Sequence, residues 1–227
     1  MFEDYAAVHR VTQGTIGREL MRRLSGTGLK ALTFWDNGFK QVSANRPLVL
    51  PDDFRGLRMR IQGSEVIEAQ MRALGAYSDP MALSDVYAAL QRGVVDGTEN
   101  TASNYFTQRM YEVQRYLTIS NHGYLGYVVI VNERFWRGLP AGLADTLTEA
   151  LSDATKYANA IANSENETAL DRIRALGTTQ IIELSDAQRA TWKAALFSVR
   201  DAYVARAGER FLLDVERVNA AAAPARS

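Results

Sequence analysis

Apolar residues recur every three or four positions along several stretches of the chain, which is the spacing of an amphipathic helix. The longest pattern covers residues 140–176 and ends at Gly177, predicting one helix of about 35 residues, roughly three times the usual length. Shorter helical patterns cover residues 6–24, 64–74 and 84–92. At 1.5 Å per residue the longest helix spans roughly 50 Å, so we expect it to bridge two lobes.

Residues with capping chemistry mark several of the expected helix ends. Ser64 is expected to be the N-cap of one helix, and Ser84 the N-cap of the next, which Gly93 ends. Ser185 and Gln188 have the spacing of a capping box and begin a final helix.

Short apolar or alternating runs between the helices indicate strands. Asp36-Asn37-Gly38 separates the first two runs and predicts a turn. The predicted strands cover residues 29–35, 39–44, 57–61, 94–95, 115–121, 126–132 and 178–184. Strands and helices alternate, so the expected fold class is α/β with a mostly parallel sheet.

One strand carries a candidate anion site. In the run 57–61, the two arginines Arg58 and Arg60 share one face and the apolar residues share the other. Arg60 lies near the strand end, and the helix start at Gly63-Ser64 follows closely. A guanidinium beside a helix N-terminus suits a carboxylate or a phosphate, although a structural ion pair of Arg60 is an equally good interpretation.

Composition narrows the possible functions. The formal net charge is zero and the pI is about 6.8, which argues against a nucleic-acid partner. The chain has no cysteine and two histidines, His9 and His122, so a thiolate or multi-histidine metal site is excluded within one chain, and no cofactor motif is present. No apolar run approaches 18 residues, so we expect no membrane span, and the first residues do not resemble a signal peptide.

Catalysis is disfavoured, because the sequence contains no nucleophile elbow and no P-loop. No paired carboxylate is evident that could form a triad with a histidine. The enzyme alternative that stays open is an α/β enzyme acting on a small carboxylate, with His122 as acid or base at a strand end.

Several segments, taken in order, resemble the DctP-type substrate-binding proteins of TRAP transporters. The order and spacing match over roughly residues 3–205. The segments are Gly28-Leu29-Lys30, Phe34–Lys40, Gly56–Gln62, Leu74-Gly75-Ala76, Pro80–Gln91, Gly93–Asn100 and Tyr111–Leu117.

The resemblance implies a periplasmic, non-enzymatic protein with a periplasmic-binding-protein-like, two-lobed fold and a long interlobe helix. Such a protein captures an organic acid (a dicarboxylate, keto acid or sugar acid) and delivers it to a membrane permease. A sensor or scaffold subunit that binds a histidine kinase instead is a further alternative. The resemblance implies no cofactor.

The resemblance also implies the ligand residues. Arg60 is the principal one, forming a two-point salt bridge with the substrate carboxylate, and Lys40 falls where many members carry a second basic pocket residue. Each of the others has core packing as its alternative role. These other positions are Asn100 (the pocket asparagine), Gly63 (a small contact), Leu83 (a ligand cover), and Trp35 and Tyr124 (pocket walls).

Relative to the family pattern, roughly the first third of a typical member is absent, so we expect one lobe to be incomplete and ligand binding to be weak. The expected division has three parts: residues 1–37 and 126–165 as a partial lobe I, residues 38–125 and 166–219 as lobe II, and residues 220–227 as a loose tail.

Overall fold

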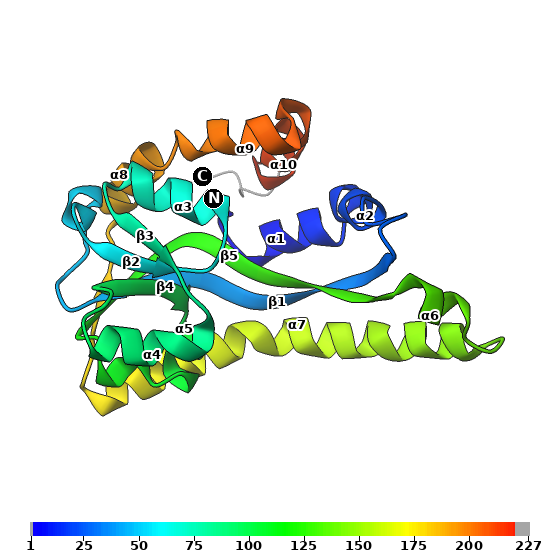
Figure 1. Cartoon of the computed structure of the whole chain (residues 1–227), viewed down its shortest axis with the longest axis horizontal. Helices are drawn as coiled ribbons and strands as arrows, with labels where there is room; N and C mark the ends of the chain where they lie inside the picture. Colours follow the sequence, from blue (N-terminus) through cyan, green and yellow to red (C-terminus); the bar gives the residue numbers. More distant parts are fainter. Residues whose placement is uncertain (1, 221–227) are drawn as a thin grey trace, which may run out of the picture. The chain divides into compact units, whose positions relative to one another are not determined.

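The computed structural model describes the backbone of residues 2–220, and the side chains of that range apart from positions 202, 205–207 and 220. Figure 1 shows the elements along the chain. The helices are α1 (Tyr5–Thr12), α2 (Thr15–Arg22), α3 (Glu65–Ala73), α4 (Leu83–Gln91), α5 (Ala102–Thr107), α6 (Glu133–Arg137), α7 (Leu143–Leu176), α8 (Asp186–Ala195), α9 (Val199–Ala207) and α10 (Glu209–Ala220), with 3-10 turns η1 (Pro51–Phe54) and η2 (Met110–Glu112). The strands are β1 (Leu29–Ala44), β2 (Arg58–Ile61), β3 (Tyr77–Pro80), β4 (Gly97–Thr101), β5 (Tyr116–Asn132) and β6 (Gln180–Glu183).

The chain divides into two compact units, and β1, β5 and α7 contribute residues to both. The first unit comprises 38–124 and 165–208, and the second comprises 2–37, 125–164 and the residues from 209 onward. The division expected from the sequence places residues 209–219 of α10 in lobe II, with residues 38–125. In the structure α10 belongs to the second unit, where it packs against α1. Residues 221–227 of the expected tail lie outside the described residues, and Ala220 is the last residue of α10.

The six strands of the described chain form one sheet in the order β3-β2-β4-β1-β5-β6. β2 runs parallel to β3 and β4, and β5 runs parallel to β6, whereas β1 runs antiparallel to β4. The carboxyl ends of β2 and β4 therefore meet at one edge of the sheet. In α/β folds that edge is where ligands bind.

Apolar clusters cover both faces of the sheet in the first unit. One cluster joins Met59 and Ile61 of β2 to Met71 of α3 and Trp192 of α8. The other brings α4, α5, β5 and α7 together around Tyr105. Figure 1 accordingly shows α3 and α4 on opposite sides of β2, β3 and β4. Because successive side chains of a strand point to opposite faces, these core residues determine on which face each residue at the strand ends lies.

The turn predicted at residues 36–38 is wrong, because β1 continues through it. Asp36 is buried, and its backbone N–H donates to the Asn159 side chain at 2.9 Å. The Asn37 side chain donates to the Tyr127 hydroxyl at 2.8 Å. Partners from α7 and β5 therefore satisfy the polar groups that would otherwise favour a turn. The two strands predicted at 115–121 and 126–132 likewise form the single strand β5.

Several predicted helix boundaries are also wrong. The single helix expected over 6–24 is divided into α1 and α2, because Gly14 has extended backbone and caps α2. Helix α4 begins two residues earlier than expected, with Ala82 rather than Ser84 as its N-cap. The final helix is three helices, and Gly208, with φ at 86°, separates the last two.

Strand signals failed at one further point. Val94-Val95 is not a strand, and β4 begins only at Gly97. Short elements β3, α5 and α6 were not predicted, because runs of four to six residues carry too little periodicity to be recognised.

The stronger capping and periodicity signals are confirmed. The Ser64 hydroxyl accepts from the Ile67 N–H at the start of α3, and both hydrogen bonds of the Ser185–Gln188 capping box are present. Helix α7 runs to Leu176, as the long apolar pattern predicts. Among the described helices, none combines the length and apolar character needed to cross a membrane.

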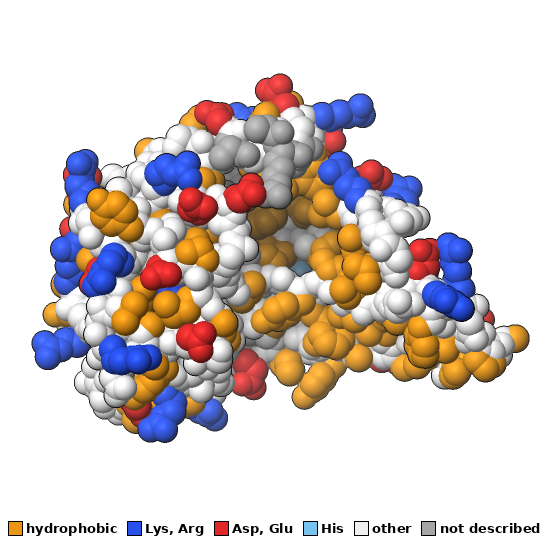
Figure 2. Space-filling view, viewed as in Figure 1, with side chains coloured by type: hydrophobic (Ala, Val, Ile, Leu, Met, Phe, Trp, Pro, Cys, Tyr) orange, Lys and Arg blue, Asp and Glu red, His pale blue; other side chains and the backbone are white. Residues whose placement is uncertain are grey.

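The part of α7 in the second unit buries little of its apolar seam. Among the described side chains, none between Leu143 and Ala160 is buried. Leu143 and Leu147 are 42% and 39% exposed, and Phe135 of α6 is 59% exposed. Figure 2 shows apolar side chains gathered over α6 and the beginning of α7. The predicted seam is therefore present but only partly covered by the described residues of this unit.

Candidate functional site

The candidate site lies in the first unit, where β2 and β4 end side by side. Arg60 is opposite Thr98 in the parallel pair of β2 and β4, so Arg60 and Asn100 share one face of the sheet. Lys40 is opposite Thr101 in the antiparallel pair of β1 and β4. Lys40 and Glu99 therefore lie on the opposite face. The sheet edge brings all four residues together but separates them into two pairs.

Arg60 is buried and only partly hydrogen-bonded. Its side chain is among the largest fully buried ones, with the residue 2% exposed. Nε and Nη2 donate to the Met81 carbonyl at 3.0 and 2.6 Å, whereas the buried Nη1 has no hydrogen-bond partner among the described residues. Burial lowers the pKa of the guanidinium, and the nearby Glu99 carboxylate opposes that shift. Nη1 is thus a charged donor available to a ligand, and Nη2 carries a second hydrogen.

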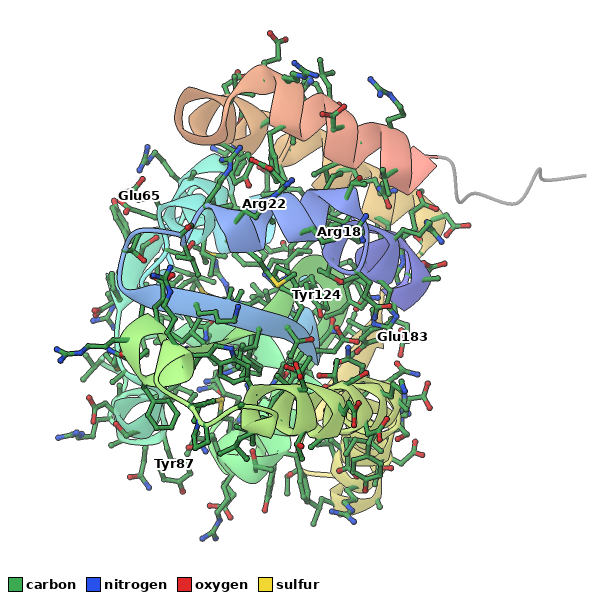
Figure 3. The ribbon with its side chains drawn as sticks, turned by 90° about the vertical axis from the view of Figure 1, so that its right-hand side faces the viewer. Arg18, Arg22, Glu65, Tyr87, Tyr124 and Glu183 are labelled. Carbon is green, nitrogen blue, oxygen red and sulfur yellow. The ribbon has the colours of Figure 1, made fainter. Side chains whose placement is uncertain are left out.

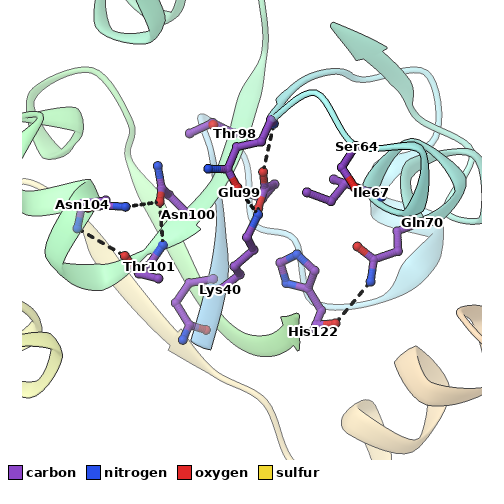
Figure 4. A network of polar contacts seen from close by, with 12 residues as sticks. Lys40, Ser64, Ile67, Gln70, Thr98, Glu99, Asn100, Thr101, Asn104 and His122 are labelled. Atoms are coloured by element: carbon purple, nitrogen blue, oxygen red, sulfur yellow. Dashed lines mark hydrogen bonds and ion pairs between the residues drawn. The ribbon is translucent and has the colours of Figure 1, made fainter. Parts of the chain in front are cut away.

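Asn100 presents a second buried donor on the same face of the sheet. Its Oδ1 accepts from the Thr101 N–H at 2.9 Å and from the Asn104 side chain at 2.8 Å (Figure 4). Those bonds fix the amide orientation and aim Nδ2 elsewhere. The buried Nδ2 has no partner within the described part of the chain. Buried polar groups are normally satisfied, so an unpaired N–H at a sheet edge indicates a place for a ligand or water oxygen.

Lys40 forms a buried ion pair instead of an open cationic contact. Its Nζ lies 2.7 Å from Glu99 Oε2 and donates to Gln62 Oε1 at 2.6 Å. The Gln62 backbone N–H donates to Glu99 Oε1 at 3.3 Å. Burial raises the pKa of the Glu99 carboxyl, and Lys40 opposes that shift. Figure 4 shows Lys40 extending to Glu99, with His122 beside it.

His122 is buried on the Lys40 side of the sheet. Its Nδ1 hydrogen-bonds to the Ser120 hydroxyl at 2.8 Å, and its ring lies 6.1 Å from that of Trp192. Burial, together with the charge of Lys40, lowers the pKa of His122 to about 3. An imidazole held neutral in this way is a poor proton donor or acceptor near neutral pH, which disfavours its role as a catalytic acid or base.

The remaining predicted site residues are dispersed. Gly63 is exposed between β2 and α3, and Leu83 packs half-buried against the cluster around Tyr105. Tyr124, labelled in Figure 3, makes an edge contact with Phe39, their ring centres 5.8 Å apart. Trp35 belongs to the second unit, where its Nε1 donates to Thr155 at 2.9 Å. The role of these four residues as ligand contacts stays a prediction. Leu83, Tyr124 and Trp35 make contacts within the protein, as described above.

Sequence reasoning missed Glu99 and Gln62 as partners of Lys40. The signal that could have found Glu99 is the alternation of β4, which places a carboxylate on the same face as a basic residue of the neighbouring strand. Gln62 follows the end of β2, and no sequence pattern specifies its contact.

The arrangement suits recognition of an oxygen-rich anion. Arg60 Nη1 and Asn100 Nδ2 are both N–H donors, and one of them is charged. Among the described residues, no group of three or more histidine, aspartate or glutamate side chains is placed to hold a metal ion.

Comparisons with known proteins show the family to which this chain belongs. A family model described as "Bacterial extracellular solute-binding protein, family 7" (DctP) matches residues 1–206. The chain is 53% identical over 220 residues to the C4-dicarboxylate-binding periplasmic protein DctP of Rhodobacter capsulatus, covering 97% of this chain and 66% of that protein. It is 40% identical to the C4-dicarboxylate-binding protein DctB of Bacillus subtilis, covering 89% of this chain and 58% of that protein.

Solved structures show the same fold. TRAP periplasmic solute-binding proteins from Shewanella oneidensis and Sulfurospirillum deleyianum, both with bound succinate, match with TM-scores of 0.93 and 0.91. Their sequences are 35% and 40% identical to this one, and each match covers 96% of this chain and 72% of the solved chain.

The fold is that of the periplasmic-binding-protein-like solute-binding proteins. The chain belongs to the bacterial extracellular solute-binding protein family 7, the DctP family. That family is a binding component of transport and not a family of enzymes, so the enzyme alternative is not supported. The chain spans between 58% and 66% of the length of the four curated relatives named DctP or DctB that it matches.

Proposed function

We propose that this protein is the extracytoplasmic solute-binding subunit of a TRAP transporter, that it acts in the periplasm, and that it captures a C4-dicarboxylate for delivery to a membrane permease. Relatives named for C4-dicarboxylate binding support the substrate class. Solved relatives with bound succinate or L-malate support it too. Keto acids and sugar acids are the other candidate substrates.

The observation that carries the proposal is the buried Nη1 of Arg60, for which the described part of the chain supplies no hydrogen-bond partner. A guanidinium held by the Met81 carbonyl on one side and lacking a partner on the other is preorganised for a carboxylate. Asn100 Nδ2 adds a neutral donor on the same face. Because both donors are fixed by hydrogen bonds to the backbone or to neighbouring side chains, little ordering is needed when the ligand arrives.

Arg60 is necessary for this function but cannot supply the affinity alone. A charge-assisted hydrogen bond contributes about 1.5–3 kcal/mol net. Micromolar binding corresponds to about 8 kcal/mol. The remainder must come from further contacts with the ligand.

Calorimetry and thermal unfolding with succinate and L-malate test the proposal. A ligand at one hundred times its Kd adds about 2.7 kcal/mol, which raises the Tm by roughly 5–10 °C for a chain of this size. Arg60→Gln removes the charged donor, and we expect it to weaken succinate binding at least tenfold.

Arg72→Gln is the matched control, since Arg72 is an exposed arginine of α3 that pairs with Glu68 in its own helix. We expect it to bind succinate as the unaltered protein does. Equal affinity of the Arg60→Gln variant and the unaltered protein would reject Arg60 as the anchor. Uptake of labelled succinate into proteoliposomes that hold a TRAP permease tests delivery to the membrane.

A further inference from the structure

We propose that Lys40, Glu99 and Gln62 form an internally neutral clamp that positions the segment after Arg60, and that Lys40 is a positioning residue and not a contact for a second ligand carboxylate. The ligand-binding part of this inference rests on the proposed function. Its structural part stands on the contacts within this chain alone.

The clamp holds Gln62 at two points. Lys40 Nζ donates to the Gln62 side-chain oxygen at 2.6 Å, and Glu99 Oε1 accepts from the Gln62 backbone N–H at 3.3 Å. Gln62 follows Arg60 by two residues and leads through Gly63 to the N-cap of α3. The pair therefore fixes the course of the chain between the guanidinium and the next helix.

The Lys40 ammonium is already neutralised before any ligand arrives. Its side chain is 6% exposed, that of Glu99 is fully buried, and their charged atoms are 2.7 Å apart. Sequence parity places this pair on the face of Met59, opposite the face that carries Arg60 and Asn100. The neighbouring His122 is neutral, so the formal charge of Lys40, Glu99 and His122 together is zero. The cation that this unit offers to a ligand at the sheet edge is then Arg60.

A buried pair responds to mutation differently from a ligand contact. Removing one partner leaves an uncompensated charge in a dry site, whereas replacing both partners by neutral residues of similar size leaves none. If Lys40 and Glu99 act through each other, the double variant must be less impaired than either single variant. If Lys40 contacts the ligand, the double variant must be at least as impaired as the Lys40 variant.

The experiment compares Lys40→Met, Glu99→Gln and the double variant of the full chain. The first readout is amide hydrogen exchange at residues 62–64 without ligand. We expect each single variant to speed exchange there at least tenfold, and the double variant, which loses the Lys40 donor but holds no uncompensated buried charge, to speed it less than either single variant. Amides of α4, on the other face of the sheet, should keep their rates, which separates a local clamp from general destabilisation.

The second readout is calorimetry with succinate. We expect each single variant to bind at least tenfold more weakly and the double variant to recover most of that loss. Lys156→Met and Asp171→Asn, which remove exposed charges on α7, are the matched controls and should change neither readout.

Two results would overturn the clamp. One is unchanged exchange at residues 62–64 in every variant. The other is a double variant that binds as weakly as Lys40→Met, which would make Lys40 a direct ligand contact. Failure of the proposed function gives a different result, in which no organic acid binds the unaltered protein while the exchange pattern still follows the clamp.

Discussion

Replacing His122 by glutamine should remove a defined part of the acid sensitivity of the fold. His122 is fully buried, and burial together with Lys40 lowers its pKa to about 3 in the folded protein. In the unfolded chain its pKa is about 6.5. Between these two values the unfolded chain binds one more proton than the folded protein. Stability from this group is therefore complete above pH 6.5 and is lost as the pH falls below it.

The magnitude follows from one proton over the pH interval. Each pH unit in that window corresponds to about 1.36 kcal/mol, so His122 costs the fold about 2 kcal/mol at pH 5 relative to pH 7.5. The His122→Gln variant has no group that titrates there, and its amide can still hydrogen-bond to Ser120. All other titrating groups are common to both proteins.

Urea unfolding followed by tryptophan fluorescence at pH 7.5 and pH 5.0 measures this difference. We expect the free energy of unfolding to fall by about 2 kcal/mol more in the unaltered protein than in the His122→Gln variant. If the two proteins lost the same free energy between these pH values, the buried neutral imidazole would be refuted.

Two further predictions concern packing. Gly97→Ala should lower the free energy of unfolding in urea by about 1–3 kcal/mol, because an added Cβ would lie 2.3 Å from the Ser43 carbonyl oxygen. Gly63→Ala is the control. Its added Cβ would meet nothing within 4 Å, so it should change the free energy of unfolding by less than about 0.5 kcal/mol. Equal losses would contradict the packing of β4 on β1. Sedimentation velocity should show concentration-dependent association through the exposed seam of α7, and Leu147→Glu should weaken it; identical sedimentation of the two proteins would exclude that surface.

The parts of the fold that sequence predicts well are those with long periodicity or explicit capping chemistry. Helix α7 extends the apolar spacing over 34 residues, and the Ser185 capping box specifies the start of α8 with two reciprocal hydrogen bonds. The failed turn at residues 36–38 shows the limit. Its residues have turn chemistry, but Asn159, more than one hundred positions away, supplies the partner that keeps Asp36 in a strand. Local propensity cannot anticipate such a long-range hydrogen bond.

The candidate site divides in the same way. The position of Arg60 was predictable, because an arginine at the end of an alternating strand that leads to a helix N-terminus is a local pattern, and its role as a ligand contact stays a prediction. The unpaired donor of Asn100 depends on Asn104 and on the start of α5, a helix that the sequence did not indicate. The role of Lys40 depends on which carboxylate faces it across the sheet, and that is fixed by register and not by composition.

The two basic residues Arg60 and Lys40 show how register alone changes chemistry. Both are buried cations at one sheet edge. Because β1 is antiparallel to β4 and pairs Lys40 with Thr101, its side chain falls on the face of Glu99, where a carboxylate neutralises it at 2.7 Å. Arg60, opposite Thr98, falls on the other face and meets a neutral carbonyl. A guanidinium satisfied on one side by a dipole keeps its full charge for an incoming anion, whereas an ammonium satisfied by a carboxylate does not. A shift of β1 by one residue would move Lys40 to the face of Arg60 and away from Glu99, so the pairing of β1 with β4 decides whether a carboxylate neutralises Lys40.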